Sequence, residues 1–378
     1  MVWGDYISLE YGKPVKDKES SDGAVPVYGT NGQIGTSHLP PLCSIPSFIV
    51  GRKGAYRGIH YSSAPFSVID TAFYALPLTD KVNMKWAYYK FLTYDINRMD
   101  SGSAIPSTDR YELYKIPVDI PDLDVQGKIV AILDSINEKI GANIEINENL
   151  EQQALTLFRH YFMDYEPYGG SAPAGWTEVS LDDVCARITD GSHYSPADTP
   201  DAPYPMYSVK DMETYRFNSS SCKHITAEEF LKMQKNDCVP RLNDILVAKD
   251  GSYLKEIFIC SEEKEEAILS SIAIFRPNTE IIMPEILLYL LKQPSIRKDV
   301  GDNYVSGSAL PRIVLKDFKK YTFLLPPMAE QLKIGSVLHA IRMQTKANID
   351  EIHSLSTLRD TLLPRLMSGE LDVSGLDL

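Results

Sequence analysis

The chain has 378 residues, of which 44% are hydrophobic and 24% charged, values typical of a globular protein with room for two or three domains. Its formal net charge of −13 argues at first against a nucleic-acid-binding protein. No secretory signal opens the chain and no apolar run reaches the roughly 18 residues of a membrane span, so we expect a cytoplasmic location.

The negative charge is distributed unevenly along the chain. Residues 1–105 carry 10 basic and 9 acidic side chains (+1), and residues 311–378 carry 9 and 8 (+1). Residues 106–166 carry 5 and 12 (−7), and residues 167–310 carry 14 and 22 (−8). The acidic residues of segment 167–310 fall in clumps such as 262–266. Such clumps are typical of solvated faces and leave other surfaces free for a partner.

Residues 1–105 predict a first globular domain of the α+β class. Short apolar runs alternate here with Gly, Pro and Ser, and we expect strands over Ser47–Val50 and Val68–Leu76 and a helix over Met84–Tyr94. Two polar loops lie before and between these elements, at residues 27–38 and 51–58.

An internal repeat follows this domain. Residues 101–162 align with residues 306–367 at a constant offset of 205 without a gap, and 18 of the 62 aligned pairs are identical. Both copies open on Ser-Gly-Ser-Ala and continue through a short apolar stretch, Tyr114–Ile120 or Tyr321–Leu325, which we expect to be a strand. An ungapped repeat of this length indicates a duplicated framework.

The rest of each copy predicts one long helix, near residues 126–163 and 331–367. Apolar residues recur at steps of three and four, which is a heptad seam, and prolines and acids precede each run. Asn143 and Asn348 interrupt the two seams at the same place, where a buried amide would fix register and partner. We therefore expect the helices to pair antiparallel as a coiled coil, although two separate amphipathic helices remain an alternative.

The second globular segment, residues 167–310, follows a linker at 167–170 and parallels the first domain loosely. Asp244–Ser252 matches Ser47–Ala55, because in both an apolar strand leads into a basic residue and a glycine turn. Ser271–Phe275 matches Thr71–Ala75 in the same way. The predicted architecture is α+β, with two globular domains carried on two framework copies.

The polar loops of both domains contain residue types that read DNA. Asn and Gln amides can pair with adenine, Arg and Lys with guanine or phosphate, and Tyr can pack on sugars or thymine methyl groups. Any one of them is more often an ordinary turn residue, so the hypothesis rests on their occurrence as sets. The candidate DNA-binding residues are Tyr28, Thr30, Asn31, Gln33, Arg52, Lys53, Tyr56 and Arg57 in the first domain, and Ser192, His193, Tyr194, Lys210, Lys249, Ser252 and Tyr253 in the second.

Catalytic and metal-binding motifs are missing from the sequence. It has no GxxxxGK[ST] loop, no HExxH, and no Asn/Asp-Pro-Pro-aromatic stretch of the kind an adenine methyltransferase uses. The five cysteines form no CxxC pair, which disfavours a metal site and fits reduced thiols. Asp244 and Lys249 resemble a nuclease pair, but such pairs are common by chance, and we interpret them as structural or DNA-facing. The chain is predicted to be non-catalytic, without a metal or cofactor of its own.

With its paired motifs SGSAIP…IPVDIPDLDVQGKI and SGSALP…FLLPPMAEQLKI, the chain resembles the specificity (S) subunit of Type I restriction-modification systems. The first copy departs from the pattern at Pro-Asp-Leu-Asp-Val-Gln, where the second has the more typical Pro-Pro-Met-Ala-Glu-Gln. The resemblance implies target-recognition domains at 1–105 and 167–310 and spacer-helix regions at 106–166 and 311–378.

The resemblance also implies a function and partners. Such a subunit reads a bipartite double-stranded DNA target, docks two methyltransferase subunits, and joins motor-nuclease subunits in the full complex. S-adenosylmethionine, ATP and magnesium would then bind to the partner subunits. The alternative is a stand-alone DNA- or protein-binding scaffold, which would form no stable complex with a methyltransferase.

Overall fold

The structure, a computed structural model, describes residues 1–18, 20, 22–99, 106–307 and 309–377. The Ser-Gly-Ser-Ala segment at 101–104 therefore lies outside the described residues. The chain forms two compact units: unit 1 comprises residues 1–142 and 351–378, and unit 2 comprises residues 143–350. Within the described ranges, no helix combines the length and apolarity needed to cross a bilayer.

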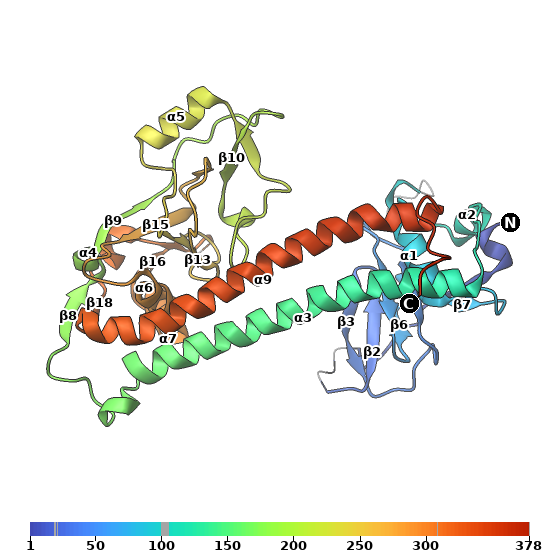
Figure 1. Cartoon of the computed structure of the whole chain (residues 1–378), viewed down its shortest axis with the longest axis horizontal. Helices are drawn as coiled ribbons and strands as arrows, with labels where there is room; N and C mark the ends of the chain where they lie inside the picture. The colour runs from blue at the N-terminus through green and yellow to red at the C-terminus, as the bar shows by residue number, and fades with distance from the viewer. Residues whose placement is uncertain (19, 21, 100–105, 308, 378) are drawn as a thin grey trace. The chain divides into compact units, whose positions relative to one another are not determined.

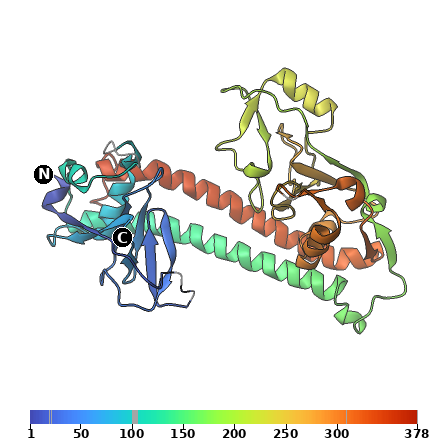
Figure 2. The ribbon, with the colours of Figure 1, turned by 180° about the vertical axis from the view of Figure 1, so that it is seen from behind.

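Two helices of about equal length contribute to both units, α3 (Leu123–Phe162) and α9 (Met328–Ser368). In unit 1, Arg359 of α9 donates to Asn137 of α3 over 3.3 Å. In unit 2, Asn348 of α9 donates to Asn147 of α3 over 2.8 Å. The helices are thus antiparallel neighbours in each unit, as their green and red ribbons show (Figures 1 and 2).

The predicted heptad seams are largely the buried faces of these helices. Ile129, Leu133 and Ile136 of α3 are buried, as are Ile334 and Leu338 of α9. Helix α3 begins where Asp122 accepts a hydrogen bond from the Val125 amide, an ordinary N-terminal cap. Both long helices of the prediction are confirmed, together with the α+β fold class.

The first domain is built on two sheets. The larger has the order β1-β7-β4-β5 and is antiparallel throughout, and the smaller has the order β3-β2-β6, with β2 and β6 parallel. The strands are β1 (Ile7–Tyr11), β2 (Val25–Gly29), β3 (Gly32–Ser37), β4 (Ser47–Gly51), β5 (Ile59–Ser62), β6 (Ser67–Val68) and β7 (Ala72–Pro77). The helices are η1 (Trp3–Asp5), α1 (Met84–Leu92), η2 (Ile96–Arg98) and α2 (Arg110–Lys115).

Two sequence-based strand predictions in this unit need correction. Val68–Leu76 is not continuous, because the chain turns at residues 69–71 and changes from the small sheet to the large one. Tyr114–Ile120 is not a strand at its start, because Asp109 accepts a hydrogen bond from the Tyr111 amide and initiates α2. The apolar side chains there pack as one helical turn and a short extended segment.

The second domain repeats both sheets. Its larger sheet has the order β13-β12-β15-β9 and its smaller sheet the order β11-β10-β14, again with one parallel pair. The strands of unit 2 are β8 (Thr177–Ser180), β9 (Cys185–Asp190), β10 (Tyr204–Tyr207), β11 (Lys223–Ile225), β12 (Ile245–Ala248), β13 (Ile257–Ile259), β14 (Ala267–Ile268), β15 (Ile272–Pro277), β16 (Val305–Ser306), β17 (Arg312–Ile313) and β18 (Thr322–Leu325). Its shorter helices are η3 (Glu166–Tyr168), α4 (Leu181–Val184), η4 (Val209–Asp211), α5 (Ala227–Lys235), α6 (Pro284–Leu291), α7 (Pro294–Asn303) and α8 (Leu315–Phe318).

Strand register confirms the correspondence that the sequence suggests between the domains. In the first domain Ile49 of β4 pairs with Tyr74 of β7. In the second, Leu246 of β12 pairs with Ile274 of β15, so that offsets of 197 and 200 hold through both strands. The two domains therefore share one skeleton, although few of its side chains are the same.

A glutamine at the start of each long helix docks that helix onto its own domain. Gln126 accepts from the Asn83 amide over 2.7 Å and donates to the carbonyls of Lys81 and Pro121 over 2.9 and 2.8 Å. Gln331 accepts from the Met283 amide over 3.0 Å and donates to the carbonyls of Ile281 and Pro326 over 2.9 and 3.0 Å. Both glutamines are buried, so each copy holds its domain by the same two bonds and the start of its own helix by a third.

Candidate nucleic-acid interface

In the first domain the turn after β2 and the loop after β4 come together. The Thr30 hydroxyl lies 2.9 Å from the Lys53 carbonyl and 2.8 Å from the Thr71 carbonyl, and the Gly58 amide donates to the Thr30 carbonyl over 3.0 Å. Asn31, with its amide nitrogen turned inward, donates to the Tyr56 carbonyl over 2.9 Å. Thr30 therefore holds the loop together, and exposed side chains of Asn31, Lys53 and Tyr56 project from it.

These contacts change the roles expected of some predicted residues. Because the amide nitrogen of Asn31 already binds the loop, Asn31 presents an oxygen and not the bidentate amide that adenine reading requires. Gln33 is exposed on β3, and its amide nitrogen donates to the Gly35 carbonyl over 3.2 Å. Tyr56 remains the most accessible aromatic of the loop, with 66% of its surface exposed.

Sequence reasoning missed a stacked array beside this loop. The guanidinium carbons of Arg52 and Arg110 lie 4.8 and 4.7 Å from the centre of the Tyr11 ring, and Arg110 also lies 5.1 Å from the Tyr111 ring. Arg52 also donates to the Asp70 carbonyl over 3.1 Å, and Arg110 to the Leu9 carbonyl over 2.9 Å. The array therefore keeps two positive charges on aromatic faces. Arg110 and Tyr11 are far apart in sequence, so no short motif could have predicted their contact.

Two predicted residues of the first domain face inward. Arg57 has 1% of its surface exposed and donates to the Ile96 and Asn97 carbonyls over 3.1 and 2.8 Å. Tyr28 packs edge-on against Phe66, with ring centres 5.8 Å apart. The structure thus gives both residues a structural role, because the loop folds over Arg57 and β2 places Tyr28 against the small core.

In the second domain Asp190 connects the two candidate loops. Its carboxylate pairs with the Lys249 ammonium and lies 3.3 Å from the His193 ring. Lys249 has 7% of its surface exposed and its charge is paired with Asp190; a DNA contact of Lys249 stays a prediction. The Ser192 hydroxyl is also turned inward and donates to the Tyr194 carbonyl over 2.7 Å.

The remaining candidates of the second domain differ in exposure. His193, Tyr194, Lys210 and Ser252 are exposed, on loops and on the short helix η4. Tyr253 is half-buried and packs against the core that α6 and α7 cover. Each exposed set of candidates thus contains one lysine, Lys53 in the first domain and Lys210 in the second.

The repeated framework holds the loop after the central strand in both domains. The Gly54 amide donates to the Pro106 carbonyl over 3.1 Å, and the Gly251 amide donates to the Pro311 carbonyl over 2.7 Å. Isolated bridges pair Lys53 with Ser107 and Asp250 with Arg312 at equivalent positions. Each copy of the Ser-Gly-Ser-Ala-x-Pro motif thus leads directly into the segment that positions a candidate DNA-binding loop.

Polar residues also pair the long helices within unit 2. Asn348 is buried and donates to Asn147, whose own amide nitrogen lies 3.5 Å from the Thr345 carbonyl. Gln344 donates to Asn348 over 2.8 Å. Asn143 is buried as well. The contact between Asn348 and Asn147 is of the kind that a role in setting helix register requires, and it involves Asn147 as the partner of Asn348.

The aspartate and the lysine that resemble a nuclease pair bind different partners. Asp244 is fully buried and accepts two hydrogen bonds from Arg276, each 2.8 Å, so it does not act with Lys249. In the part of the chain that the structure describes, no three metal-ligating side chains cluster. An apolar pocket of unit 2 at the end of α3, between Phe158, Ile286 and Tyr321, has no charged side chain in its lining.

Comparison with known proteins identifies this two-domain arrangement. The family model "Type I restriction modification DNA specificity domain" matches residues 10–152 and 173–354, which together include both globular domains and much of both long helices. The chain belongs to this family. As a specificity subunit of the Type I class it provides DNA specificity, and the specificity domain itself is non-catalytic.

Relatives of this family match over most of their length. The MjaIX specificity subunit of Methanocaldococcus jannaschii is 24% identical over 315 residues, covering 79% of this chain and 71% of the relative. The HindI specificity subunit of Haemophilus influenzae is 23% identical over 317 residues, covering 68% and 69%. The crystal structure of a Type I S subunit from M. genitalium matches 97% of this chain and 95% of its own with a TM-score of 0.63 at 14% identity, a likeness that concerns the fold.

Proposed function

We propose that this specificity subunit reads a bipartite duplex DNA target, one half-site with each recognition domain. The observation that carries the proposal is the duplicated loop support: in each domain a framework segment binds the loop after the central strand by the same backbone bonds. The subunit would work in the cytoplasm with two methyltransferase subunits and, in the full complex, motor-nuclease subunits. S-adenosylmethionine, ATP and magnesium would be bound by those partners.

Electrostatics support a division of labour between this subunit and its partners. The net charge of −13 cannot provide the counterion release that drives tight DNA binding, so most phosphate contacts would come from the methyltransferase subunits. In the first domain, Arg52, Lys53 and Arg110 form a local cationic surface that fits a few phosphates. The exposed Gln33 and Tyr56 lie on its loops and would approach bases or sugars.

Domain exchange tests the bipartite reading. Replacing residues 1–105 with the corresponding domain of another family member should change one half of the methylated sequence and leave the other half intact. Methylation mapping of cells that carry the hybrid and its methyltransferase gives the result. Alteration of both halves would overturn the proposal, and failure of the subunit to copurify with a methyltransferase would favour the stand-alone scaffold.

Single substitutions separate base reading from phosphate contact. Gln33→Ala should relax discrimination at individual bases, by about 1–3 kcal/mol if its amide exchanges the Gly35 carbonyl for a bidentate contact with a base. Lys53→Ala should weaken binding to every sequence and reduce the salt slope by about one. Arg98→Ala is the matched control, since Arg98 is exposed and paired with Asp95 over 3.0 Å outside the loops. Equal losses on specific and random DNA for all three variants would show that these loops do not read the target.

A further inference from the structure

Each recognition domain rests on the first half of a long helix in the same way. Helix α1 packs beside α3 in unit 1, and α6 packs beside α9 in unit 2, each held by the buried glutamine already described. The apolar side chains of the seam are also the same at three consecutive positions: Ile129 and Ile334, Leu133 and Leu338, and Ile136 and Ile341. Neither the glutamine nor the seam can therefore distinguish one domain from the other.

The ion pairs beside this seam have their positive and negative partners exchanged between the two units. In unit 1 the domain helix supplies the cation: Lys85 of α1 lies 2.7 Å from the carboxylate of Asp134 on α3. Tyr89 donates to the same carboxylate over 2.6 Å, and Asn137 donates to the Tyr89 hydroxyl over 2.9 Å. Asp134 is thus fixed by two groups of the first domain.

In unit 2 the domain helix supplies the anion. Glu285 of α6 has 3% of its surface exposed, and its carboxylate lies 2.7 Å from His339 and 3.1 Å from Arg342, both on α9. Glu285 and Lys85 stand at the same position under the offset of 200, and His339 and Asp134 at the same position under the offset of 205. Arg342 likewise stands where the first copy has Asn137. The pair is therefore reversed at equivalent positions.

We propose that this reversal assigns each recognition domain to its own helix, so that the partner of α1 is α3 and the partner of α6 is α9. On the wrong helix, Lys85 would face His339 and Arg342 without a carboxylate, and Glu285 would face Asp134. Glu285 is buried, and a buried charge without a partner is far more costly than the pair is stabilising, which makes its mismatch an effective rejection. Lys85 has 32% of its side chain exposed, so its mismatch is rejected less strongly. The inference concerns folding and positional identity, and it does not depend on the DNA target.

A duplicated-domain chain tests the inference in the full-length protein. A second copy of the first domain is placed on the α9 framework in place of residues 167–305, and protection of each domain from protease is measured. On unmodified α9, the grafted copy should be cleaved about threefold faster or more than the same domain at its own position, because the partly exposed Lys85 would lose its carboxylate partner. Introducing the first copy's residues, His339→Asp with Arg342→Asn, should restore protection.

The same two substitutions in the unaltered chain give the reciprocal result. Here Glu285 would face an aspartate, so the second domain should lose protection to at least the same extent. An effect of the same sign in both chains, or none in either, would overturn the inference. If the graft does not fold on either framework, Glu285→Lys in the native chain decides: its loss of protection must be reversed by His339→Asp with Arg342→Asn, and absence of rescue refutes the proposal.

Discussion

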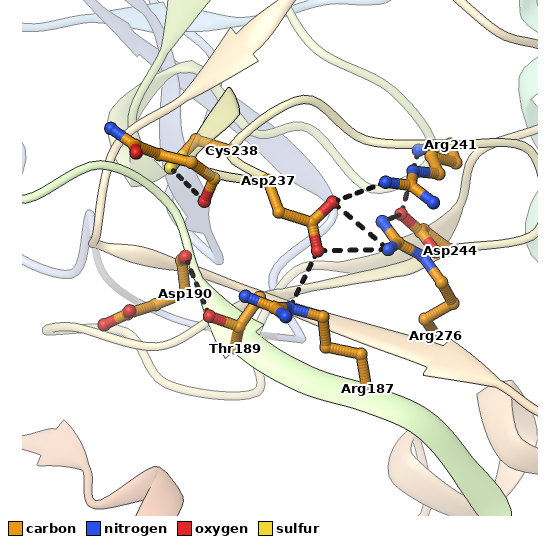
Figure 3. Close-up of polar contacts among 9 residues, drawn as sticks. Arg187, Thr189, Asp190, Asp237, Cys238, Arg241, Asp244 and Arg276 are labelled. Atoms are coloured by element: carbon orange, nitrogen blue, oxygen red, sulfur yellow. Dashed lines mark hydrogen bonds and ion pairs between the residues drawn. The ribbon is translucent and has the colours of Figure 1, made fainter. Parts of the chain in front are cut away.

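The two recognition domains share their strand order but differ in the segments that lie outside the sheets and in the contacts that attach these segments. The second domain inserts α5 between β11 and β12, where the first has only the loop between β3 and β4. Beside this insertion an ion cluster spans the sheet and the end of α5 (Figure 3). Asp237 lies within 2.7 to 3.2 Å of three guanidinium groups, and Asp244 binds one of them. The three arginines are Arg187, Arg241 and Arg276.

At the equivalent positions the first domain has uncharged residues. Ser8, Ser47 and Leu76 stand where the second has Arg187, Asp244 and Arg276. Ser47 is buried and donates to the Ala75 carbonyl over 2.6 Å. The cluster is therefore an addition that accompanies α5 and attaches it to the sheet edge, and the shared skeleton folds without it.

The largest effect is expected from Asp244→Ala. It leaves the mostly buried Arg276 with one fewer carboxylate and should lower the local free energy of unfolding of β12 and β15 by about 3–5 kcal/mol. Ser47→Ala, the matched change in the first domain, removes one hydrogen bond and should cost about 1 kcal/mol. Hydrogen exchange of the strand amides measures both in one protein. Equal losses would contradict the idea that only the second domain depends on the cluster.

The basic residue after the central strand is expected to have a different role in each domain. Lys249 should contribute to stability, and Arg52 to DNA binding. Lys249→Ala removes the buried partner of Asp190 and should destabilise the second domain by roughly 1–3 kcal/mol. Arg52→Ala removes only a stacked, half-exposed cation and should cost about 0.5–1 kcal/mol. It should instead weaken DNA binding and flatten its salt dependence. Urea unfolding and DNA titration at several salt concentrations give the comparison, which would fail if Lys249→Ala affected DNA alone.

The helix pair offers a third contrast. Asn147 and Thr345 in unit 2 occupy positions where the other copy has Ile352 and Ile140. Replacing Asn147 and Asn348 together with leucine should stabilise this part of the pair by about 1 kcal/mol, since buried polar pairs are often less stable than apolar ones. The expected loss is in register, visible as multiple helix-helix crosslinks from single cysteines. One unchanged crosslink would show that Asn147 and Asn348 do not specify register.

The smallest expected difference between the domains is in the reactivity of their cysteine thiols. All five cysteines are buried, one in the first domain and four in the second. Burial raises the pKa of every one of these thiols, and that of Cys185 rises to about 12. Iodoacetamide at pH 8 should therefore label almost no thiol in the native protein and all five after denaturation. Rapid labelling of Cys238, which packs with Phe230 and Met233 of α5, would show that α5 opens readily.

The framework could be predicted from the sequence because it is repeated. The exposure of the candidate site residues could not, because it depends on contacts with residues far away in the sequence. An ungapped offset of 205 is visible in the sequence alone, and the long helices follow from their heptads. Burial of Arg57 and Lys249 is not visible, because the partners that accept their hydrogen bonds lie 40 and 59 residues away. The same is true of Tyr11, whose place between two arginines depends on the pairing of β1 with β7. The domain boundaries at 105, 166 and 310 remain predictions, as do the individual DNA contacts.

Gln126 and Gln331 have a consequence for how such proteins evolve. Each binds only main-chain atoms of its domain, so the residues that it holds can change freely: Lys81 and Asn83 in one copy are Ile281 and Met283 in the other. A recombination event that brings in a new domain at the same position therefore meets an attachment point that places no demand on side-chain identity. At this attachment point a whole domain can be inherited without a compensating mutation of the glutamine, whereas the ion pair beside it still has to match.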